Sequence, residues 1–379
     1  MTYYLIAGER SGDLHGGNLI RAIRQYDPQA QFRAWGGEQM QEAGATLVRH
    51  YREMAFMGFL EVVQNLGTIR KNLRDCQRDL LQTRPDVLIL IDYAGFNLRM
   101  ARFAKQHGIR VFYYISPKVW AWNQRRALKI KATVDRLFVI FSFEVPFFER
   151  YDYKVDYVGN PLMDAIAAFR PDGNFRQRHN LGSGPIVALL PGSRRQEVKD
   201  VLPTMLAVSK GFPAIRFVLA GVSNLPRSLY DEALNDYPNI PLLIDQTYDL
   251  LAVAEAALVT SGTATLETAL FNVPQVVCYR TTWVSYQIAK RLIAVPYISL
   301  VNLIAEKEAV RELIQDALTT ENLADELRRI LPGGPQRQQQ LADYATVQAK
   351  VGGPGASGRA GMLMAQAVAG NQQTTQSTS

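Results

Sequence analysis

Two polar turns, each shortly after an apolar run of strand length, carry residue types that can bind a diphosphate. The runs cover 186–190 and 256–259, and the turns contain Gly192, Ser193 and Arg194 in the first case and Ser261, Gly262 and Thr263 in the second. A helix starting at such a turn directs free backbone N–H groups at an anion beyond the strand, and arginine adds a charged fork. Each turn alone could equally be an ordinary connection, with Arg194 in solvent and Ser261 as a helix cap. Together they favour a site for a nucleotide diphosphate.

Glu267 follows Thr263 by one helical turn, so the two side chains share a helix face. A carboxylate in this position can accept hydrogen bonds from a ribose diol, although a solvated surface residue is the simpler alternative. No pair of closely spaced aspartates lies near either turn. We therefore expect that the protein needs no divalent metal and no other cofactor.

Three titratable side chains lie at turns that could face a substrate. Asp92 comes directly after the apolar run 87–91, and in open α/β sheets ligands bind beyond the carboxyl ends of the strands. The same carboxylate could instead cap the following helix. Asp13 and His15 lie in the loop GERSGDLHGG, which lacks both the GxGxxG pattern and the P-loop lysine. We interpret this loop as facing a substrate, with contacts at Ser11 and Gly12.

The segment 54–66, MAFMGFLEVVQNL, concentrates apolar side chains in a short stretch. A core helix would explain it, since a run of this length usually packs inside a domain. The alternative is an acyl-chain groove or a membrane-surface patch with basic residues nearby. The candidate lipid contacts are Met54, Phe56, Met57 and Phe59, with Trp120 and Trp122 of the segment SPKVWAWNQRR. These tryptophans could line a cleft or simply pack between domains.

Strand-length apolar runs alternate with helical segments along most of the chain. We predict strands at 3–7, 31–37, 87–91, 111–115, 136–141, 186–190, 216–220, 241–244 and 256–259. This alternation is typical of parallel, doubly wound α/β sheets. The length of 379 residues favours two domains. The predicted fold is therefore two Rossmann-like domains with parallel sheets that face a central cleft.

Glycine and proline at 159–161 mark a predicted hinge between the domains. We place the first domain, which carries the apolar segment 54–66, at 1–165 and the second domain, which carries both predicted diphosphate turns, at 166–340. A helix near 340–368 could pack back on the first domain. The polar tail 370–379 is expected to be disordered.

The net charge of +7 and the pI near 9.3 indicate acidic partners, such as a phosphorylated substrate, an anionic membrane surface or nucleic acid. Cys76 and Cys278 are far apart and lack a metal-ligand spacing, so neither a disulfide framework nor a zinc site is expected. The N-terminus has no signal-peptide pattern, and no apolar run is long enough to cross a bilayer. These features fit a cytoplasmic protein that is soluble or lies on a membrane surface.

The motifs GERSGDLHGG, IDYAGFN, ISPKVWAWNQRR, LLPGSRRQEV, TSGTATLE and LVNLI occur in this order. In this combination the sequence resembles the lipid A disaccharide synthases, inverting glycosyltransferases of the GT-B fold that act in lipopolysaccharide assembly. The resemblance covers roughly residues 1–345. It implies UDP-2,3-diacylglucosamine as donor, 2,3-diacylglucosamine 1-phosphate as acceptor, and a β-1,6-linked disaccharide phosphate and UDP as products. It also implies contact with the inner-membrane surface and is compatible with a homodimer.

The resemblance assigns roles to individual residues. It marks Arg194 as a functional residue and places Ser261, Glu267 and Asn302 at the donor site. The chain departs from the family in two motifs, with Arg10 where a small residue is usual and with Gly95 where many members have a candidate catalytic aspartate. Because an inverting transfer needs a base for the acceptor hydroxyl, Asp92 becomes the preferred candidate, with Asp13 and His15 as alternatives.

Two other classes of function compete with this interpretation. One is another GT-B enzyme, such as a UDP-GlcNAc 2-epimerase or a glycosyltransferase for a different lipid, which would not require the apolar segment 54–66. The other is a non-catalytic module that binds nucleotide sugars or nucleic acid, prompted by the basic pI and by Trp120 and Trp122 beside arginines. The basic residues are dispersed and form no RNA-binding signature, so we expect no nucleic-acid partner.

Overall fold

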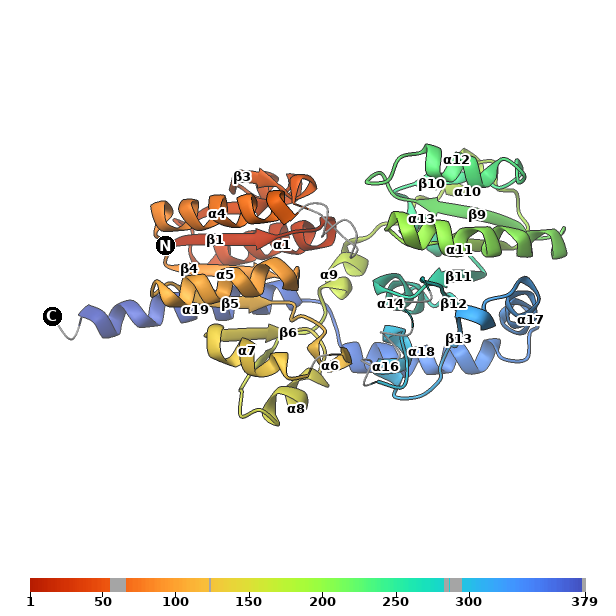
Figure 1. The fold of residues 1–379 in the computed structure, drawn as a ribbon. Helices are drawn as coiled ribbons and strands as arrows, with labels where there is room; N and C mark the ends of the chain where they lie inside the picture. The colour runs from red at the N-terminus through yellow and green to blue at the C-terminus, as the bar shows by residue number, and fades with distance from the viewer. Residues whose placement is uncertain (55–65, 123, 283–285, 287–294, 377–379) are drawn as a thin grey trace. The chain divides into compact units, whose positions relative to one another are not determined.

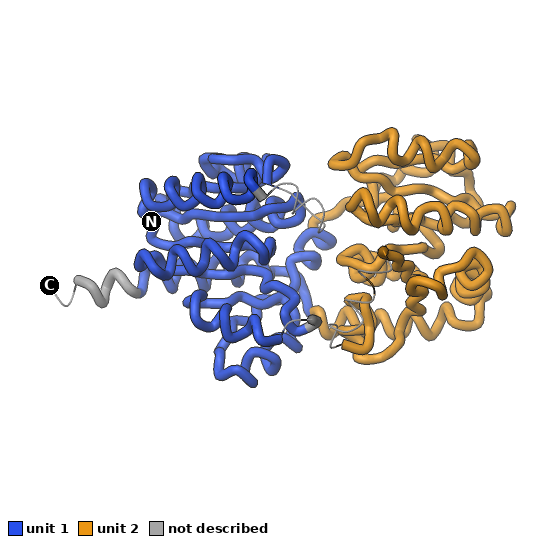
Figure 2. Tube along the Cα trace, viewed as in Figure 1, with its two compact units in different colours: residues 1–167, 352–379 blue, residues 168–351 orange. Residues whose placement is uncertain are grey.

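The computed structural model describes residues 1–54, 66–122, 124–282, 286 and 295–376 (Figure 1). The chain forms two compact units (Figure 2). One unit consists of Met1–Ala167 together with Gly352–Ser379, and the other of Ala168–Val351. We refer to them as unit 1 and unit 2.

Unit 1 is built on a parallel sheet of seven strands in the order β3-β2-β1-β4-β5-β6-β7. The strands are β1 (Thr2–Ala7), β2 (Gln31–Gly36), β3 (Thr46–His50), β4 (Val87–Ile91), β5 (Arg110–Tyr114), β6 (Arg136–Val139) and β7 (Asp156–Tyr157). The helices are α1 (Arg10–Tyr26), α2 (Glu38–Glu42), α4 (Leu66–Thr83), α5 (Ala94–Gln106), α6 (Val119–Trp122), α7 (Arg126–Thr133), α8 (Glu144–Glu149), α9 (Pro161–Ala168) and α19 (Ala356–Gln376).

Alternate side chains of the β1 strand enter two different cores of unit 1. Tyr3 and Leu5 belong to the buried cluster that also contains residues of α1 and α19, whereas the Tyr4 hydroxyl lies 3.9 Å from Cys76 of α4. Since strand side chains alternate between faces, α1 and α19 cover one face of the sheet and α4 covers the other, together with its neighbours α5 and α7 (Figure 1). The α1 and α19 helices can approach closely because Gly361 has no side chain. A Cβ at that position would lie only 2.7 Å from the Ala22 Cβ.

Unit 2 contains a parallel sheet of six strands in the order β10-β9-β8-β11-β12-β13. The strands are β8 (Ile186–Leu190), β9 (Arg216–Gly221), β10 (Leu242–Ile244), β11 (Ala256–Thr260), β12 (Gln275–Tyr279) and β13 (Arg311–Ile314). The helices are α10 (Phe175–Arg178), α11 (Arg195–Val208), α12 (Ser228–Leu234), α13 (Thr247–Val253), α14 (Thr263–Leu270), α16 (Leu300–Ala305), α17 (Thr320–Ile330) and α18 (Arg337–Val351).

The two parallel α/β sheets confirm the predicted fold class. The first break between the units falls after Ala167, whereas the predicted boundary was after residue 165. The chain returns to unit 1 at Gly352. The helix predicted near 340–368 is two helices, because the segment Gly352–Gly355 interrupts it: α18 belongs to unit 2, and α19 packs on α1 in unit 1.

The C-terminal tail and the two cysteines can also be compared with the sequence predictions. The tail that is expected to be disordered from Gly370 continues α19 as far as Gln376, since extending an existing helix adds a hydrogen bond per residue without a new nucleus. Both cysteines are buried as free thiols. In the part of the chain that the structure describes, no helix is long and apolar enough to cross a membrane.

Candidate donor and acceptor site

The turn after β8 has the geometry of an anion site. Gly192 has a φ of +104°, which favours glycine, and a Cβ there would collide with the carboxylate of Glu197. Ser193 and Arg194 are exposed at the start of α11. The Glu197 carboxylate accepts hydrogen bonds from the Ser193 backbone N–H at 3.3 Å and from the Arg194 guanidinium at 3.2 Å. A ligand diphosphate would compete with this carboxylate, which the sequence analysis did not identify.

The turn after β11 lies beside the first turn. Strands β8 and β11 are parallel neighbours, with Leu190 opposite Val259, so their carboxyl ends meet at one edge of the sheet. Gly262 precedes the first turn of α14, and Thr263 is exposed. The structure therefore brings the two predicted turns together.

Glu267 is more enclosed than a solvated surface residue. Its Oε1 atom accepts a hydrogen bond from the Tyr248 hydroxyl at 2.8 Å. Burial raises the pKa of the Glu267 carboxyl, and the hydrogen bond from Tyr248 opposes that shift. This environment is unusual for a surface glutamate and fits a ligand-binding carboxylate.

Asn302, which the resemblance places at the donor site, has no exposed surface with which to contact a ligand. It is completely buried, its amide donates to the Val310 carbonyl at 2.8 Å and to Glu312 at 2.9 Å, and its oxygen accepts from the Val310 N–H. Glu312 also accepts from the Ile298 N–H at 3.0 Å, and the Ile298 carbonyl accepts from the Ser261 hydroxyl at 2.9 Å. Asn302 is thus a structural support of the loop behind Ser261, because its polar atoms are engaged inside the protein.

Asp13 also has a structural position. Its carboxylate is buried and accepts hydrogen bonds from the backbone N–H groups of Gly37 at 2.7 Å, Gln39 at 3.0 Å and Met40 at 3.1 Å. These donors belong to the start of α2, so Asp13 caps that helix from a distance. A carboxylate held by three N–H groups is a poor choice for a general base, which corrects the alternative offered above.

His15 lies in a buried polar neighbourhood of unit 1. Burial lowers the pKa of its imidazole to about 4, and the nearby Asp164 carboxylate only partly opposes this. An imidazole with such a pKa is a weak proton acceptor at neutral pH. Asp164 itself accepts hydrogen bonds from the backbone N–H groups at the start of α19, including that of Ser357 at 2.8 Å. Among the residues before Asp13, Ser11 is exposed and Gly12 is buried against Ala7.

Asp92 is exposed at the carboxyl end of β4 and has strained backbone geometry. Its φ is +44° and that of Tyr93 is +47°, a left-handed conformation that costs about 1–3 kcal/mol per non-glycine residue. The Tyr93 hydroxyl donates to the Met54 carbonyl at 2.8 Å, and its ring fills the space that a Cβ at Gly8 would need. Asn97 donates to the Asp92 carbonyl at 2.8 Å. These contacts hold the strained turn and present the Asp92 side chain at the edge where ligands bind in such sheets.

The SPKVWAW segment is anchored by a glutamate that the sequence analysis missed. Glu144 is 1% exposed and accepts hydrogen bonds from the Ser116 hydroxyl, from the Ile140 N–H at 3.1 Å and from the Phe141 N–H at 3.0 Å. Burial raises the pKa of Glu144 to about 7, and hydrogen bonds, including one from Trp120, partly oppose this. The only sequence signal is an isolated acidic residue inside an aromatic stretch.

The predicted lipid contacts are only partly described. Met54 and Trp120 are buried, at 1% and 6% exposure, and the Trp120 ring packs edge-on to Phe143 at 4.9 Å, so both are interior residues and not exposed contacts. Phe56, Met57 and Phe59 lie outside the described residues, as does the side chain of Trp122. Most of segment 54–66 lies outside the described residues, so the core helix and the lipid groove both stay predictions.

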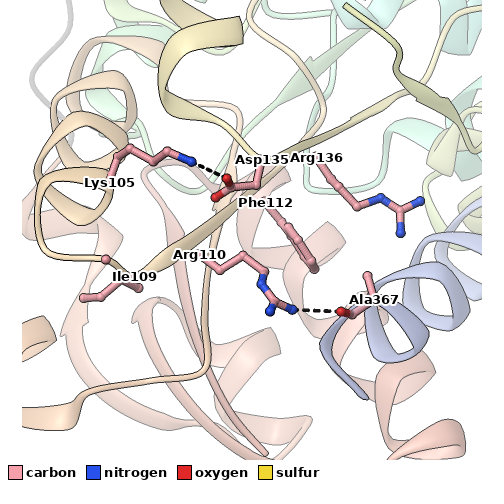
Figure 3. A pocket seen from close by; sticks show the side chains of 8 residues that line it. Lys105, Ile109, Arg110, Phe112, Asp135, Arg136 and Ala367 are labelled. Atoms are coloured by element: carbon pink, nitrogen blue, oxygen red, sulfur yellow. Dashed lines mark hydrogen bonds and ion pairs between the residues drawn. The ribbon is translucent and has the colours of Figure 1, made fainter. Parts of the chain in front are cut away.

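A hollow of about 580 Å³ in unit 1 lies at the opposite edge of the sheet, where β5 and β6 begin (Figure 3). Arg110 donates there to the Ala367 carbonyl at 2.8 Å, and Lys105 pairs with Asp135. The cations that line it are used to fix α19 and the strand ends. None of the predicted site residues lines it, so we do not assign the reaction to this hollow. Within the described ranges, no cluster of three His, Cys, Asp or Glu side chains could hold a metal ion.

Comparison with known proteins decides between the competing classes. The family model described as lipid-A-disaccharide synthetase matches residues 3–363. The chain belongs to this family. Lipid-A-disaccharide synthase of Geobacter sulfurreducens is 38% identical over 95% of this chain and 96% of its own length, and that of Syntrophus aciditrophicus is 40% identical with the same coverage. The chain is thus a glycosyltransferase with a role in lipid A disaccharide synthesis, acting on lipid A precursor sugars.

Solved structures support the fold alone. UDP-GlcNAc 2-epimerase from Neisseria meningitidis, bound to UDP-GlcNAc, aligns with a TM-score of 0.65 at 13% identity over 97% of this chain and 99% of its own. The Methanocaldococcus jannaschii UDP-GlcNAc 2-epimerase aligns with a TM-score of 0.63 at 15% identity and the same coverage. The predicted GT-B fold is confirmed. The epimerase reaction is not favoured for this chain, because the much closer relatives are disaccharide synthases.

Proposed function

We propose that the enzyme transfers the diacylglucosamine of UDP-2,3-diacylglucosamine to 2,3-diacylglucosamine 1-phosphate, and that the edge of the unit 2 sheet beyond β8 and β11 binds the donor diphosphate. The observation that carries the donor site is the parallel pairing of these strands, which puts Arg194 and the N-terminus of α14 at one edge. Positive charge there would stabilise the negative charge that develops on the leaving UDP.

Asp92 is the proposed general base. It combines exposure, position at a strand end and a strained turn held by surrounding contacts. The carboxylate would take the proton of the acceptor hydroxyl while C1 of the donor is attacked from the face opposite UDP. Asp13 is engaged in capping α2, and the low pKa of His15 makes it a weak base, so neither competes well for this role.

The test is turnover in detergent micelles, followed as UDP release and lipid product. Arg194→Ala should lower kcat/KM by roughly a hundredfold, the scale of losing one charge-stabilising group. Arg227→Ala is the matched control, because Arg227 is an exposed arginine of the same unit. Equal activity of the two variants would contradict the donor site.

The base is tested separately. Asp92→Asn should keep UDP affinity and lose turnover by at least roughly a hundredfold, as expected for a general base, whereas Glu149→Gln, at another exposed carboxylate of unit 1, should change neither. A folded Asp92→Asn enzyme with near-normal turnover would refute the assignment. We also propose metal independence, so that EDTA leaves the rate unchanged; a loss restored by magnesium would contradict this.

We further propose that unit 1 contacts the cytoplasmic surface of the inner membrane. The adjacent helices α4, α5 and α7 and the residue before α7 present the exposed cations Arg70, Lys71, Arg74, Arg78, Arg99, Arg102, Arg125, Lys129 and Lys131. The α4 acids Asp75 and Asp79 pair with arginines of other elements, so the face is positive overall. Anionic lipids attract such a face by about 1 kcal/mol per cation near the surface.

Sedimentation with vesicles tests this contact. Vesicles with anionic lipid should bind the enzyme in low salt, and purely zwitterionic vesicles should bind it less. Changing Arg70, Lys71 and Arg74 to glutamine should weaken binding, while the same change at Lys199, Lys210 and Arg227 of unit 2 should not. Equal binding by both triple variants would contradict the proposed face. Light scattering on the purified enzyme, without vesicles, tests for a homodimer, whose mass would be twice 42.5 kDa.

A further inference from the structure

The donor-site carboxylate Glu267 has a dedicated hydrogen-bond donor in a neighbouring helix. Tyr248 lies in the first turn of α13, and its hydroxyl donates to the Glu267 Oε1 atom at 2.8 Å. The bond takes one of the two carboxylate oxygens. The second oxygen remains for a ligand hydroxyl pair, which is the role proposed for Glu267.

Two further rings fix the position of the Tyr248 side chain. Phe169 packs edge-on to Tyr248, with ring centroids 5.6 Å apart and an interplanar angle of 88°. Phe271, which follows α14, lies with its ring centroid 5.0 Å from that of Tyr248. Phe169 and Phe271 also contact each other at 5.6 Å. A phenol held by two aromatic neighbours loses little further freedom on donating a hydrogen bond, so its direction is set before any ligand arrives.

The electrostatics give the hydroxyl a defined role. Burial and the adjacent Glu267 charge raise the pKa of Tyr248 well above its usual range, so the phenol keeps its proton at every working pH. The hydrogen bond favours the charged form of Glu267 against the effect of burial. Tyr248 is therefore a permanent hydrogen-bond donor. Glu267 is a buried carboxylate whose charged form is stabilised by such a donor.

We propose that Tyr248 is a positioning residue of the donor site, which orients the Glu267 carboxylate so that it can accept hydrogen bonds from the ribose diol of a uridine diphosphate. This inference rests on the proposed donor site. It assigns ribose recognition to a pair of residues, where the sequence indicated only Glu267. It also means that selectivity for ribose over deoxyribose depends on a hydroxyl that does not touch the nucleotide.

Calorimetric binding of UDP and of 2′-deoxy-UDP tests the inference without requiring turnover. The wild-type enzyme should bind UDP about tenfold more tightly than 2′-deoxy-UDP, the scale of one hydrogen bond to a charged group. Tyr248→Phe, which removes only the hydroxyl, should reduce that preference to less than about threefold. Tyr237→Phe is the control, because Tyr237 lies in the same unit and contacts Lys210 rather than Glu267.

Two more readouts separate positioning from a general structural role. The acid-side loss of UDP affinity should begin at higher pH in Tyr248→Phe than in wild type, since Glu267 loses its stabilising donor. Adding Tyr248→Phe to Glu267→Gln should cost no further selectivity, since the tyrosine acts through the carboxylate.

An unchanged preference for UDP in Tyr248→Phe would overturn the inference, and so would additive losses in the double variant. Failure of the wild type to bind UDP would overturn both the inference and the donor site. If UDP binds with the expected selectivity but no disaccharide forms, the inference stands and the proposed reaction fails.

Discussion

Replacing Glu144 by glutamine should remove a pH dependence of stability that comes from a single buried carboxyl. The folded protein raises the pKa of Glu144 from 4.5 to about 7, chiefly by burial. Between these values the folded state keeps the proton and the unfolded chain releases it. The corresponding stabilisation is fully present below pH 4.5 and is lost as the pH rises through 7. Its size is roughly 3 kcal/mol, from the difference between the two pKa values.

Glutamine can keep the backbone hydrogen bonds of Glu144 without titrating. Its oxygen can accept from the Ile140 and Phe141 N–H groups, as the Glu144 Oε2 atom does at 3.1 and 3.0 Å. Its amide can donate to the Ser116 hydroxyl, which is free to rotate. At pH 8, where Glu144 is ionised in a buried site, the variant should therefore be at least as stable as wild type. At pH 5 wild type should be relatively more stable, by roughly 2–3 kcal/mol compared with pH 8, because part of the stabilisation is already lost between pH 4.5 and pH 5.

Urea unfolding at several pH values measures this difference. Pulsed hydrogen exchange on peptides of unit 1 reports the unfolding of that unit separately, which matters because a chain with two units need not unfold in one step. Other titrating groups cancel when wild type and variant are subtracted. A difference in the free energy of unfolding that stays constant within about 1 kcal/mol from pH 5 to pH 8 would refute the account of Glu144.

Three further substitutions test single contacts by thermal or urea unfolding. Asp13→Asn should lower the free energy of unfolding by about 2 kcal/mol, because an amide facing the Gln39 N–H replaces an acceptor by a donor; unchanged stability with lost turnover would instead support a catalytic Asp13. Gly95→Asp should raise stability by about 0.5 kcal/mol, since a Cβ there meets nothing within 4 Å and an anion suits the first turn of α5; a lower melting temperature would contradict this. Asn302→Ala should cost about 3 kcal/mol, because it leaves the buried N–H and carbonyl of Val310 without their partner and removes one hydrogen bond to Glu312; a loss of UDP affinity at full stability would restore Asn302 to the donor site.

The sequence predicts best what depends on one segment at a time. The apolar run at 87–91 ends where β4 ends, and it leaves Asp92 exposed at the expected edge. The two donor turns could be paired because strands of an alternating α/β segment are parallel and share an edge. Strand β12, Gln275–Tyr279, was missed although its apolar run is readable, and β3, Thr46–His50, was missed because polar residues interrupt it.

Side-chain roles that depend on contacts distant in sequence could not be predicted. Asp13 has the type and position of a catalytic residue, but its partners are backbone groups of another helix start. Glu144 stands out only as an acidic residue in an aromatic stretch, and its Ser116 partner, which gives it a role, lies 28 residues earlier. Asn302 matches a family motif, yet its amide is consumed by Val310 and Glu312. In each case the sequence gives the residue type but does not show which distant group it hydrogen-bonds.

The helix α19 gives the chain an unusual order of completion. It begins at Ala356, near the end of the sequence, yet its Ala360 and Met364 are fully buried in the core formed by the first strands. Unit 2 is one continuous segment, so all of it has been synthesised before α19 appears. During translation, one apolar face of the unit 1 sheet therefore stays incompletely covered until α19 has left the ribosome. A premature stop shortly after Val351 would spare every residue of the donor unit and still leave the opening unit without part of its core.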